Sequence, residues 1–351
     1  MHLNSLIVFN IGILFLNYLP ILKKKIYLCG KYETMDWKKV SLEYEFMNYV
    51  SKLNKKKQHL DTFRPIPSYI LNTIKDNLNI EWTYNSNNIE GNTLTLLETR
   101  MVLEEGITVK GKSLREHFEV VNHQEAIEYV EFLAKPGYKI TEKDILEIHS
   151  LVLNKIEKDF AGRLRTAGVR ITGANFIPPN AYKVPELLTE LLYWTSEDNI
   201  AHFIAKVCVF HHRFVWIHPF FDGNGRTARL LTNLLLMKEG FPPAIILSAD
   251  RKRYYEALNL ANEGNYSKLM YLIAQALDRS LTIYLSNLDD TAGDFDSISN
   301  IIEEPSIPYG QEYVSLLARK GKIEAYKENG VWFTKKSAIE EYQKNRKRIR
   351  K

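Results

Sequence analysis

Apolar residues recur every three or four positions along most of this chain, a spacing typical of α-helices with a buried face. Proline residues at positions 65 and 67 separate the first two helical segments. The helices that we expect cover residues 45–53, 68–78, 120–130, 140–156, 184–194, 200–215, 227–237, 249–264 and 269–285. The pattern therefore predicts a mainly α protein built around a helical bundle.

The spacing changes in two places. Residues 162–180 alternate, contain turn glycines and end in Pro178-Pro179-Asn180, a pattern typical of a short β-hairpin. Beyond residue 308 the pattern predicts a helix, two strands and a second helix, over 311–318, 321–327, 330–334 and 337–347. This order of elements resembles that of small winged helix-turn-helix modules.

These changes predict five parts of the chain. They are an apolar N-terminal extension (1–34), an N-terminal helical region (35–115), a helical core (116–286), an acidic linker (287–308) and a small C-terminal module (309–351). The linker assignment rests on six acidic residues, two prolines and the absence of lysine and arginine.

The N-terminal extension has two interpretations. Its apolar stretch, residues 3–22, is interrupted by asparagines and followed by Lys23-Lys24-Lys25, whereas a signal peptide carries its positive charge first. The stretch approaches the roughly 20 residues that a membrane-spanning helix requires, so it is a candidate anchor. We favour the alternative, in which it is an upstream extension and Met35 is the true start. Either interpretation predicts a cytoplasmic location for the rest of the chain.

Composition and charge narrow the picture further. The chain has 351 residues, 45% of them hydrophobic and 25% charged, which is ordinary for a folded soluble protein. Two cysteines, Cys29 and Cys208, make neither a disulfide framework nor a CxxC metal site. The net charge is +5, but residues 310–351 alone carry twelve basic residues and five glutamates, or +7, which leaves −2 for the remainder. DNA contact is therefore a hypothesis for the C-terminal module only, where docking to a protein explains the charge equally well.

The stretch from His218 to Arg229 carries the clearest chemistry. Gly223 and Gly225 lack side chains, so backbone N–H groups there can approach an anion closely. A helix is expected to begin at this point, and a helix N-terminus favours negative charge. Arg226 and Arg229 lie three residues apart and project from one face of that helix. The residues predict a site for a polyphosphate.

The same stretch, His-Pro-Phe-Phe-Asp-Gly-Asn-Gly-Arg-Thr-Ala-Arg, resembles the signature of the Fic family and matches it at every specified position. The resemblance implies that His218 is a general base and that Asp222 holds Mg²⁺. It also implies that the nucleotide phosphates contact backbone N–H groups of the loop and two arginines. The residues concerned are Gly223, Asn224, Gly225, Arg226 and Arg229.

A second motif precedes the first. Ser86 and Glu90 are one turn apart on a predicted helical face, and Gly91 marks the helix end. By themselves these residues would suggest a surface acid. They are similar to the inhibitory helix of Fic proteins, which implies that Glu90 pairs with Arg229 and so removes a guanidinium that the terminal phosphate needs.

Two further residues follow from the resemblance. Tyr255 and Asn262 match positions that approach the adenine or the α-phosphate, although an aromatic residue at helical spacing is equally compatible with packing in the core. The hairpin at 162–180 matches the flap that aligns a target segment as an added strand.

The expected activity is transfer of AMP from ATP to a Ser, Thr or Tyr hydroxyl of a protein, with Mg²⁺ as cofactor and autoinhibition by Glu90. The alternatives are removal of AMP at the same site, and a DNA-binding regulator that only senses nucleotide. The sequence leaves open the target protein, and it also leaves open a homodimer.

Overall fold

The computed structural model describes residues 26–27, 41–42, 44–197, 202–288, 295–328 and 330–349. The apolar stretch 3–22 lies outside these residues. The helices of the bundle are α2 Tyr44–Thr62, α3 Ser68–Ile89, α4 Leu96–Glu105, α5 Leu114–Leu133, α6 Glu142–Val152, α7 Val184–Ser196, α8 Phe203–Ile217, α9 Asn224–Lys238, α10 Arg251–Asn262 and α11 Ser267–Leu288. Each helix expected from the apolar spacing has its counterpart among them.

Sequence signals at the helix ends explain several boundaries. Thr95, Ser113 and Thr141 each form a capping box with an acid three residues later, so α4, α5 and α6 begin with satisfied N–H groups. The C-terminal end of α3 is also explained: the helix is capped by Glu90, and Gly91 follows with a φ of 107°, which a glycine adopts without strain. The expected end of the helix that carries Ser86 is therefore confirmed.

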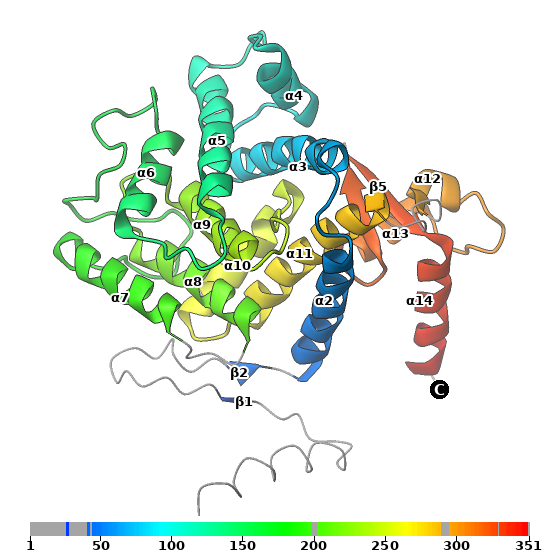
Figure 1. Cartoon of the computed structure of the whole chain (residues 1–351). Helices are drawn as coiled ribbons and strands as arrows, with labels where there is room; N and C mark the ends of the chain where they lie inside the picture. The colour runs from blue at the N-terminus through cyan, green and yellow to red at the C-terminus, as the bar shows by residue number, and fades with distance from the viewer. Residues whose placement is uncertain are drawn as a thin grey trace, which may run out of the picture.

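The core of the bundle is centred on α8 and α9. These two helices pack against each other, and α5, α6, α7 and α11 surround them (Figure 1). Most apolar side chains of α8 and α9, including Phe210, Phe214 and Leu231, are buried. Because α8 ends and α9 begins at the candidate anion loop, this packing fixes both sides of the loop.

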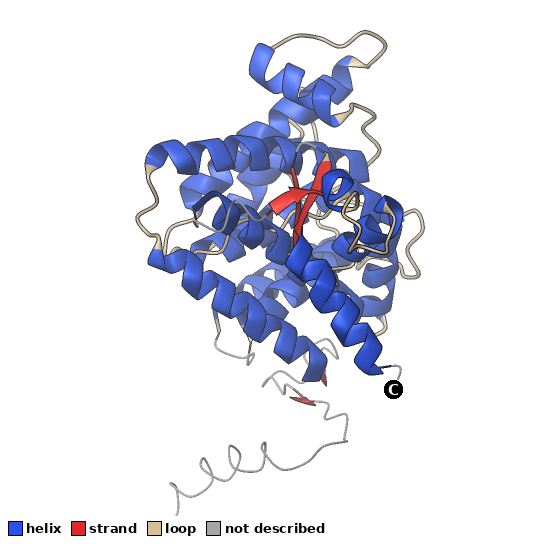
Figure 2. Cartoon of the chain, turned by 90° about the vertical axis from the view of Figure 1, so that its right-hand side faces the viewer, coloured by secondary structure: helices blue, strands red, loops and turns tan. Residues whose placement is uncertain are grey.

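The hairpin predicted at 162–180 is not formed, since these residues, all of them described, contain no strand. Figure 2 shows the strands elsewhere in the molecule. The segment is held by side chains instead of a backbone ladder: Arg165 binds surrounding carbonyl groups, and Asn175 bonds to Asn259 and Asn262 on α10. Alternation in sequence does not distinguish such an extended loop from a hairpin.

The C-terminal module contains a three-stranded antiparallel sheet in the order β3–β5–β4. Its elements are β3 Phe295–Ser297, α12 Ile298–Ile301, α13 Gln311–Arg319, β4 Ala325–Glu328, β5 Val331–Lys335 and α14 Lys336–Ile349. The predicted helix, strand, strand and helix are all present. The linker prediction is wrong over 295–308, because Ile298, Ile301 and Ile307 are buried together with Val314 and Ile339 in the core of the module. A winged helix-turn-helix assignment stays a prediction.

None of the described helices is both long enough and apolar enough to cross a lipid bilayer.

Candidate functional site

The loop from His218 to Gly223 joins α8 to α9 and is braced from within. His218 ends α8 with a φ of 50°, in the left-handed region that non-glycine residues seldom adopt. The side chain of Asn224 accepts a hydrogen bond from the N–H of Phe220 and donates one to its carbonyl group, both at 2.9 Å. The amide of Asn224 thus fixes the loop, and the strained backbone at His218 is held in place by its surroundings.

Arg165 braces the same loop from the preceding segment. The residue is only 2% exposed, and its guanidinium group donates to the carbonyl oxygens of His218, Ala167, Pro179 and Ile217. A buried charge is stable only when its donors are satisfied, and four carbonyl groups meet this requirement here.

His218 is oriented so that its Nε2 atom is the basic one. Its Nδ1 atom lies 3.3 Å from the carbonyl oxygen of Val215, so Nδ1 carries the proton and Nε2 keeps its lone pair. Burial lowers the pKa of His218 to about 4, with Arg165 adding to the effect, although the Val215 carbonyl and the carboxylates of Glu90 and Asp222 oppose it. The imidazole is therefore neutral at pH 7.

His149 supports the loop from α6. Its ring stacks on Phe220 at a centroid distance of 3.5 Å. The N–H of Gly162 donates to Nδ1, so Nε2–H donates to the carbonyl oxygen of Asp222 at 3.0 Å. A Cβ atom at Gly223 would lie 3.2 Å from this ring, which together with a φ of 75° accounts for the glycine.

Arg226, in the first turn of α9, has a buried guanidinium group. Its side chain is 3% exposed, and its Nε and Nη1 atoms have no hydrogen-bond partner among the described residues. The carboxylates of Glu119 and Asp222 stand at 3.6 and 3.7 Å from it, too far for normal hydrogen bonds. Because unpaired buried donors are costly, this guanidinium is suited to an anionic ligand.

The first turn of α9 adds backbone donors to the same place. Its N-cap is Gly223, which offers no capping side chain, and a backbone hydrogen bond runs from the N–H of Thr227 to the carbonyl oxygen of Gly223. The N–H groups of Asn224, Gly225 and Arg226 precede that bond and belong to the end of the helix that attracts anions.

Arg229 meets the end of α3. Its Nη2 atom lies 2.8 Å from Glu90 Oε1, its Nε atom donates to Ser86 Oγ at 3.0 Å, and Nη2 also donates to the carbonyl oxygen of Ser86. Nη1 is buried without a hydrogen-bond partner among the described residues. The Glu90 carboxylate raises the pKa of Arg229 against the opposing effect of burial.

Glu90 also occupies the space next to the loop. A Cβ atom at Gly225 would lie 2.2 Å from Glu90 Oε1, so the glycine allows the carboxylate to approach the first turn of α9. Gly91 follows directly and turns the chain away. The structure thus brings Ser86, Glu90, Gly225 and Arg229 together.

Tyr255 and Asn262 both lie on α10 and contact different parts of the protein. The hydroxyl of Tyr255 donates to the carbonyl oxygen of Ile89 at 3.4 Å, at the end of α3, and Arg251 lies over its ring. The side chain of Asn262 instead contacts His212 on α8 and Asn175 in the extended loop. Both are joined to protein groups in this structure, and their nucleotide contacts stay predictions.

Asp222 is the candidate metal ligand. Its side chain is 47% exposed and forms an ion pair with Arg115 at 2.9 Å. Among the described residues there is no cluster of three or more His, Cys, Asp or Glu side chains suited to a metal. One exposed carboxylate fits Mg²⁺, which commonly binds through one or two carboxylates together with the phosphates of a substrate.

Comparison with known proteins identifies the group. Residues 139–236 match the model of the family described as "Fic/DOC family". The chain is 32% identical to the solved structure of Fic-1 from C. elegans, with a TM-score of 0.63, over 69% of this chain and 72% of that one. The chain belongs to the Fic/DOC family.

Two further comparisons are consistent with this assignment to the Fic/DOC family. A Fic-domain signaling protein from Bacteroides thetaiotaomicron is 25% identical, with a TM-score of 0.60 over 67% of this chain and 96% of its own. The curated Protein adenylyltransferase Fic of Nematostella vectensis is 41% identical over 207 residues, which are 58% of this chain and 48% of that protein. The chain spans about half the length of the curated relatives that it matches.

Several residues of this Fic site were not expected from the sequence. Arg165, His149 and Arg115 each contact the loop from at least 50 residues away in the chain. His123 is fully buried beside Arg226 and Arg229, which join burial in lowering its pKa. The sequence offers only one sign of His149 and His123, namely that each lies among the apolar positions of a predicted helix.

Proposed function

We propose that the chain transfers AMP from ATP to a hydroxyl group of a protein side chain. The observation that carries the proposal is the buried guanidinium of Arg226, with two nitrogen atoms that lack hydrogen-bond partners among the described residues, at the uncapped start of α9, on the loop that also carries the neutral imidazole of His218. Anion donors and a base on one loop are the two groups that this transfer requires. Relatives named protein adenylyltransferase Fic support the proposal.

The chemistry follows from these positions. Nε2 of His218 takes the hydroxyl proton as the oxygen attacks the α-phosphorus of ATP, so that a bond from that oxygen to phosphorus forms and the bond to the β-phosphate oxygen breaks. Pyrophosphate leaves. The N–H groups of α9 and the guanidinium of Arg226 stabilise the charge that develops on the phosphates.

Asp222 is the residue that would hold Mg²⁺. A bound Mg²⁺ would supply positive charge that offsets the negative charge developing on the leaving pyrophosphate. The carboxylate of Asp222 is about half exposed and forms an ion pair with Arg115.

We infer further that α3 restrains the activity. The Glu90 carboxylate forms an ion pair with the guanidinium of Arg229. Arg229 is the second cation on this face of α9, and a nucleoside triphosphate would need it to bind its phosphates. Since Glu90 also lies against Gly225, a γ-phosphate directed at Arg229 would meet a negative charge.

The position of the label distinguishes AMP transfer from other reactions. The Glu90→Gly chain is incubated with Mg²⁺ and labelled ATP, either alone or with a protein substrate. We expect the protein to become labelled from α-labelled ATP and not from γ-labelled ATP. His218→Ala in the same background should reduce the rate at least about 100-fold, the usual contribution of a general base. Label from the γ-position would show phosphate transfer and overturn the proposal.

A further inference from the structure

The hairpin of β4 and β5 in the C-terminal module rests on α3, the helix that carries Ser86 and Glu90. The N–H of Gly330 donates to Glu81 Oε1, and Asn77 Nδ2 donates to Glu328 Oε1, each at 3.4 Å. Arg100 on α4 donates to Asn77 and so fixes that amide from the other side. The module therefore contacts α3 through Glu328 at the end of β4 and through Gly330 in the turn of the hairpin.

Glu81 is the centre of this contact. Glu81 is 8% exposed, and burial raises the pKa of its carboxyl group. Lys327 on β4, the N–H of Gly330 and the side chain of Asn85 oppose that rise. A buried carboxylate requires such partners, and two of the three come from the C-terminal module.

Asn85 carries the contact toward the site. Its Nδ2 atom donates to Glu81 Oε2 at 3.1 Å, and its Oδ1 atom accepts the N–H of Ser248 at 2.8 Å. Asn85 immediately precedes Ser86, which binds Arg229. Glu81 thus fixes the amide that ties the last turns of α3 to the segment before α10.

The segment that begins at Ser248 completes the support. It leads into α10, where Arg251 Nε donates to the carbonyl oxygen of Ile89 at 2.6 Å, directly before Glu90. The last turns of α3 are therefore held from Ser248 at Asn85 and from α10 at Ile89.

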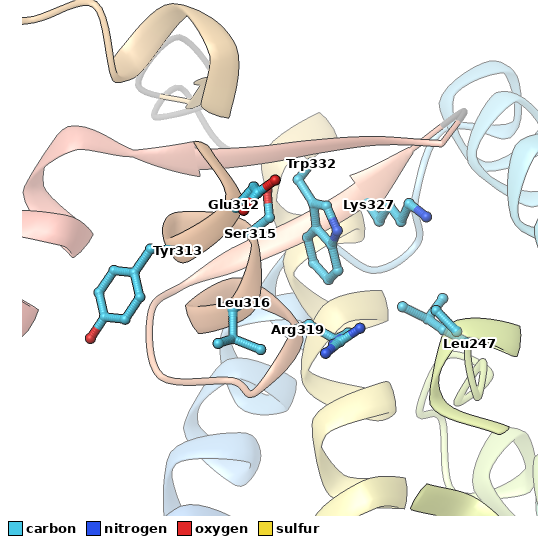
Figure 3. A pocket seen from close by; sticks show the side chains of 9 residues that line it. Leu247, Glu312, Tyr313, Ser315, Leu316, Arg319, Lys327 and Trp332 are labelled. Carbon is cyan, nitrogen blue, oxygen red and sulfur yellow. The ribbon is translucent and has the colours of Figure 1, made fainter. Parts of the chain in front are cut away.

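The remaining contact between the module and this segment is loose. A cavity of about 560 Å³ separates α13 and Trp332 from Leu247 (Figure 3), and the ion pair across it, Arg319 with Asp250, measures 3.9 Å. Lys327 lines the same cavity. The hairpin is thus the close contact on this side of α3.

We propose that Glu81 is a positioning residue for the Glu90–Arg229 ion pair, and that the β4–β5 hairpin holds the end of α3 in its inhibitory place through it. This inference rests on the proposed function and names how the inhibition is set: a partner that moves the C-terminal module would release Glu90 from Arg229.

A double-mutant comparison in the full chain tests this inference. Glu81→Ala removes the acceptor of the Gly330 N–H and one of the two acceptors of Asn85 Nδ2, whose bond to the backbone carbonyl oxygen of Glu81 at 2.7 Å remains. We expect about fivefold more label from α-labelled ATP, the effect of losing one buried hydrogen bond of ordinary strength. In the Glu90→Gly background the same change should alter labelling less than about twofold, because the ion pair is already absent. Glu81→Gln retains an acceptor oxygen and should stay closer to wild type than Glu81→Ala.

Hydrogen exchange gives a readout that does not depend on activity. Amides of residues 86–91 should exchange faster in Glu81→Ala than in wild type, and Glu105→Ala, at the exposed end of α4, should leave them unchanged. If Glu81→Ala does not fold, Glu328→Ala, which removes the hydrogen bond of the hairpin to Asn77, is compared with wild type in the same two experiments.

Three results would overturn the inference: no gain of labelling in Glu81→Ala, an equal change in the Glu90→Gly background, or unchanged exchange at residues 86–91. If Glu90→Gly itself is labelled no better than wild type, the restraint by Glu90 that we proposed fails, and the exchange experiment still decides whether Glu81 holds the end of α3.

Discussion

His218 shows at the residue scale how position modifies a side chain that the sequence identifies. An ordinary histidine titrates near pH 6.5 and would be partly charged in a neutral solution. Burial at the end of α8 lowers its pKa to about 4, and the Val215 carbonyl selects the tautomer with a free Nε2. A neutral imidazole is the form that accepts a proton.

This lowered pKa predicts the pH dependence. A base with a depressed pKa stays active as pH falls and is lost only when pH approaches the folded value. We expect AMP transfer by Glu90→Gly to change little between pH 8 and 6 and to decline toward pH 4. NMR titration of the His218 ring signal, assigned by its loss in His218→Ala, measures the pKa directly. A midpoint near 6.5 would contradict the assignment.

Single residues also mark what the sequence could predict. Ser86 and Glu90 are one helical turn apart, and the structure places both on Arg229. Arg165 and His149 reach the loop from 53 and 73 residues away, and local spacing contains no information about such contacts. The motif defines the loop, whereas the fold supplies the residues that hold it.

Among the elements, the segment between α6 and α7 differs most from its prediction. Its alternating pattern predicts a hairpin, but its backbone bonds go elsewhere: the N–H of Arg165 donates to the carbonyl oxygen of Pro219. The linker before α13 differs in a similar way, since three buried isoleucines lie among its acids. Helix spacing over many residues is a stronger signal than either of these short patterns.

Arg165 tests the importance of this segment. Arg165→Ala leaves four carbonyl groups without their buried donor, so we expect a loss of about 3 kcal/mol in the free energy of unfolding. Chemical denaturation measures it. Arg163→Ala, at an exposed position two residues earlier, is the matched control and should change stability by less than about 0.5 kcal/mol. Equal stability of the two variants would show that the Arg165 network is dispensable.

For the whole molecule, buried histidines link stability to acid. Burial lowers the pKa of His149 and His212 to about 4 and that of His211 to about 3. Between the unfolded value near 6.5 and these folded values, the unfolded chain binds protons that the native chain does not. The free energy of unfolding therefore falls as pH decreases through this window.

Thermal unfolding at several pH values tests this linkage. Each such histidine contributes a slope of about 1.4 kcal/mol per pH unit within the window. We expect Tm to change little between pH 8 and 7 and to fall steadily from pH 6.5 to 4.5. His211→Gln, which removes one titrating group, should flatten the decline. A Tm that is constant down to pH 4.5 would show that these histidines titrate alike in both states.

At the same scale, the chain joins a Fic bundle to a C-terminal module that touches α3. The +7 charge of residues 310–351 is compatible with a DNA or a protein partner, and DNA binding stays a prediction. The restraint that we propose for α3 depends on both the Glu90–Arg229 ion pair and the contact of the module with α3.

The most direct measurement is labelling with α-labelled ATP and Mg²⁺ of four full-length chains: wild type, Glu90→Gly, Glu90→Gly/His218→Ala, and Glu105→Gly as a matched acid at another helix end. We predict weak labelling of the wild type and of Glu105→Gly, strong labelling of Glu90→Gly, and none of the double variant. If Glu90→Gly is labelled no better than wild type, the ion pair of Glu90 with Arg229 does not restrain the enzyme.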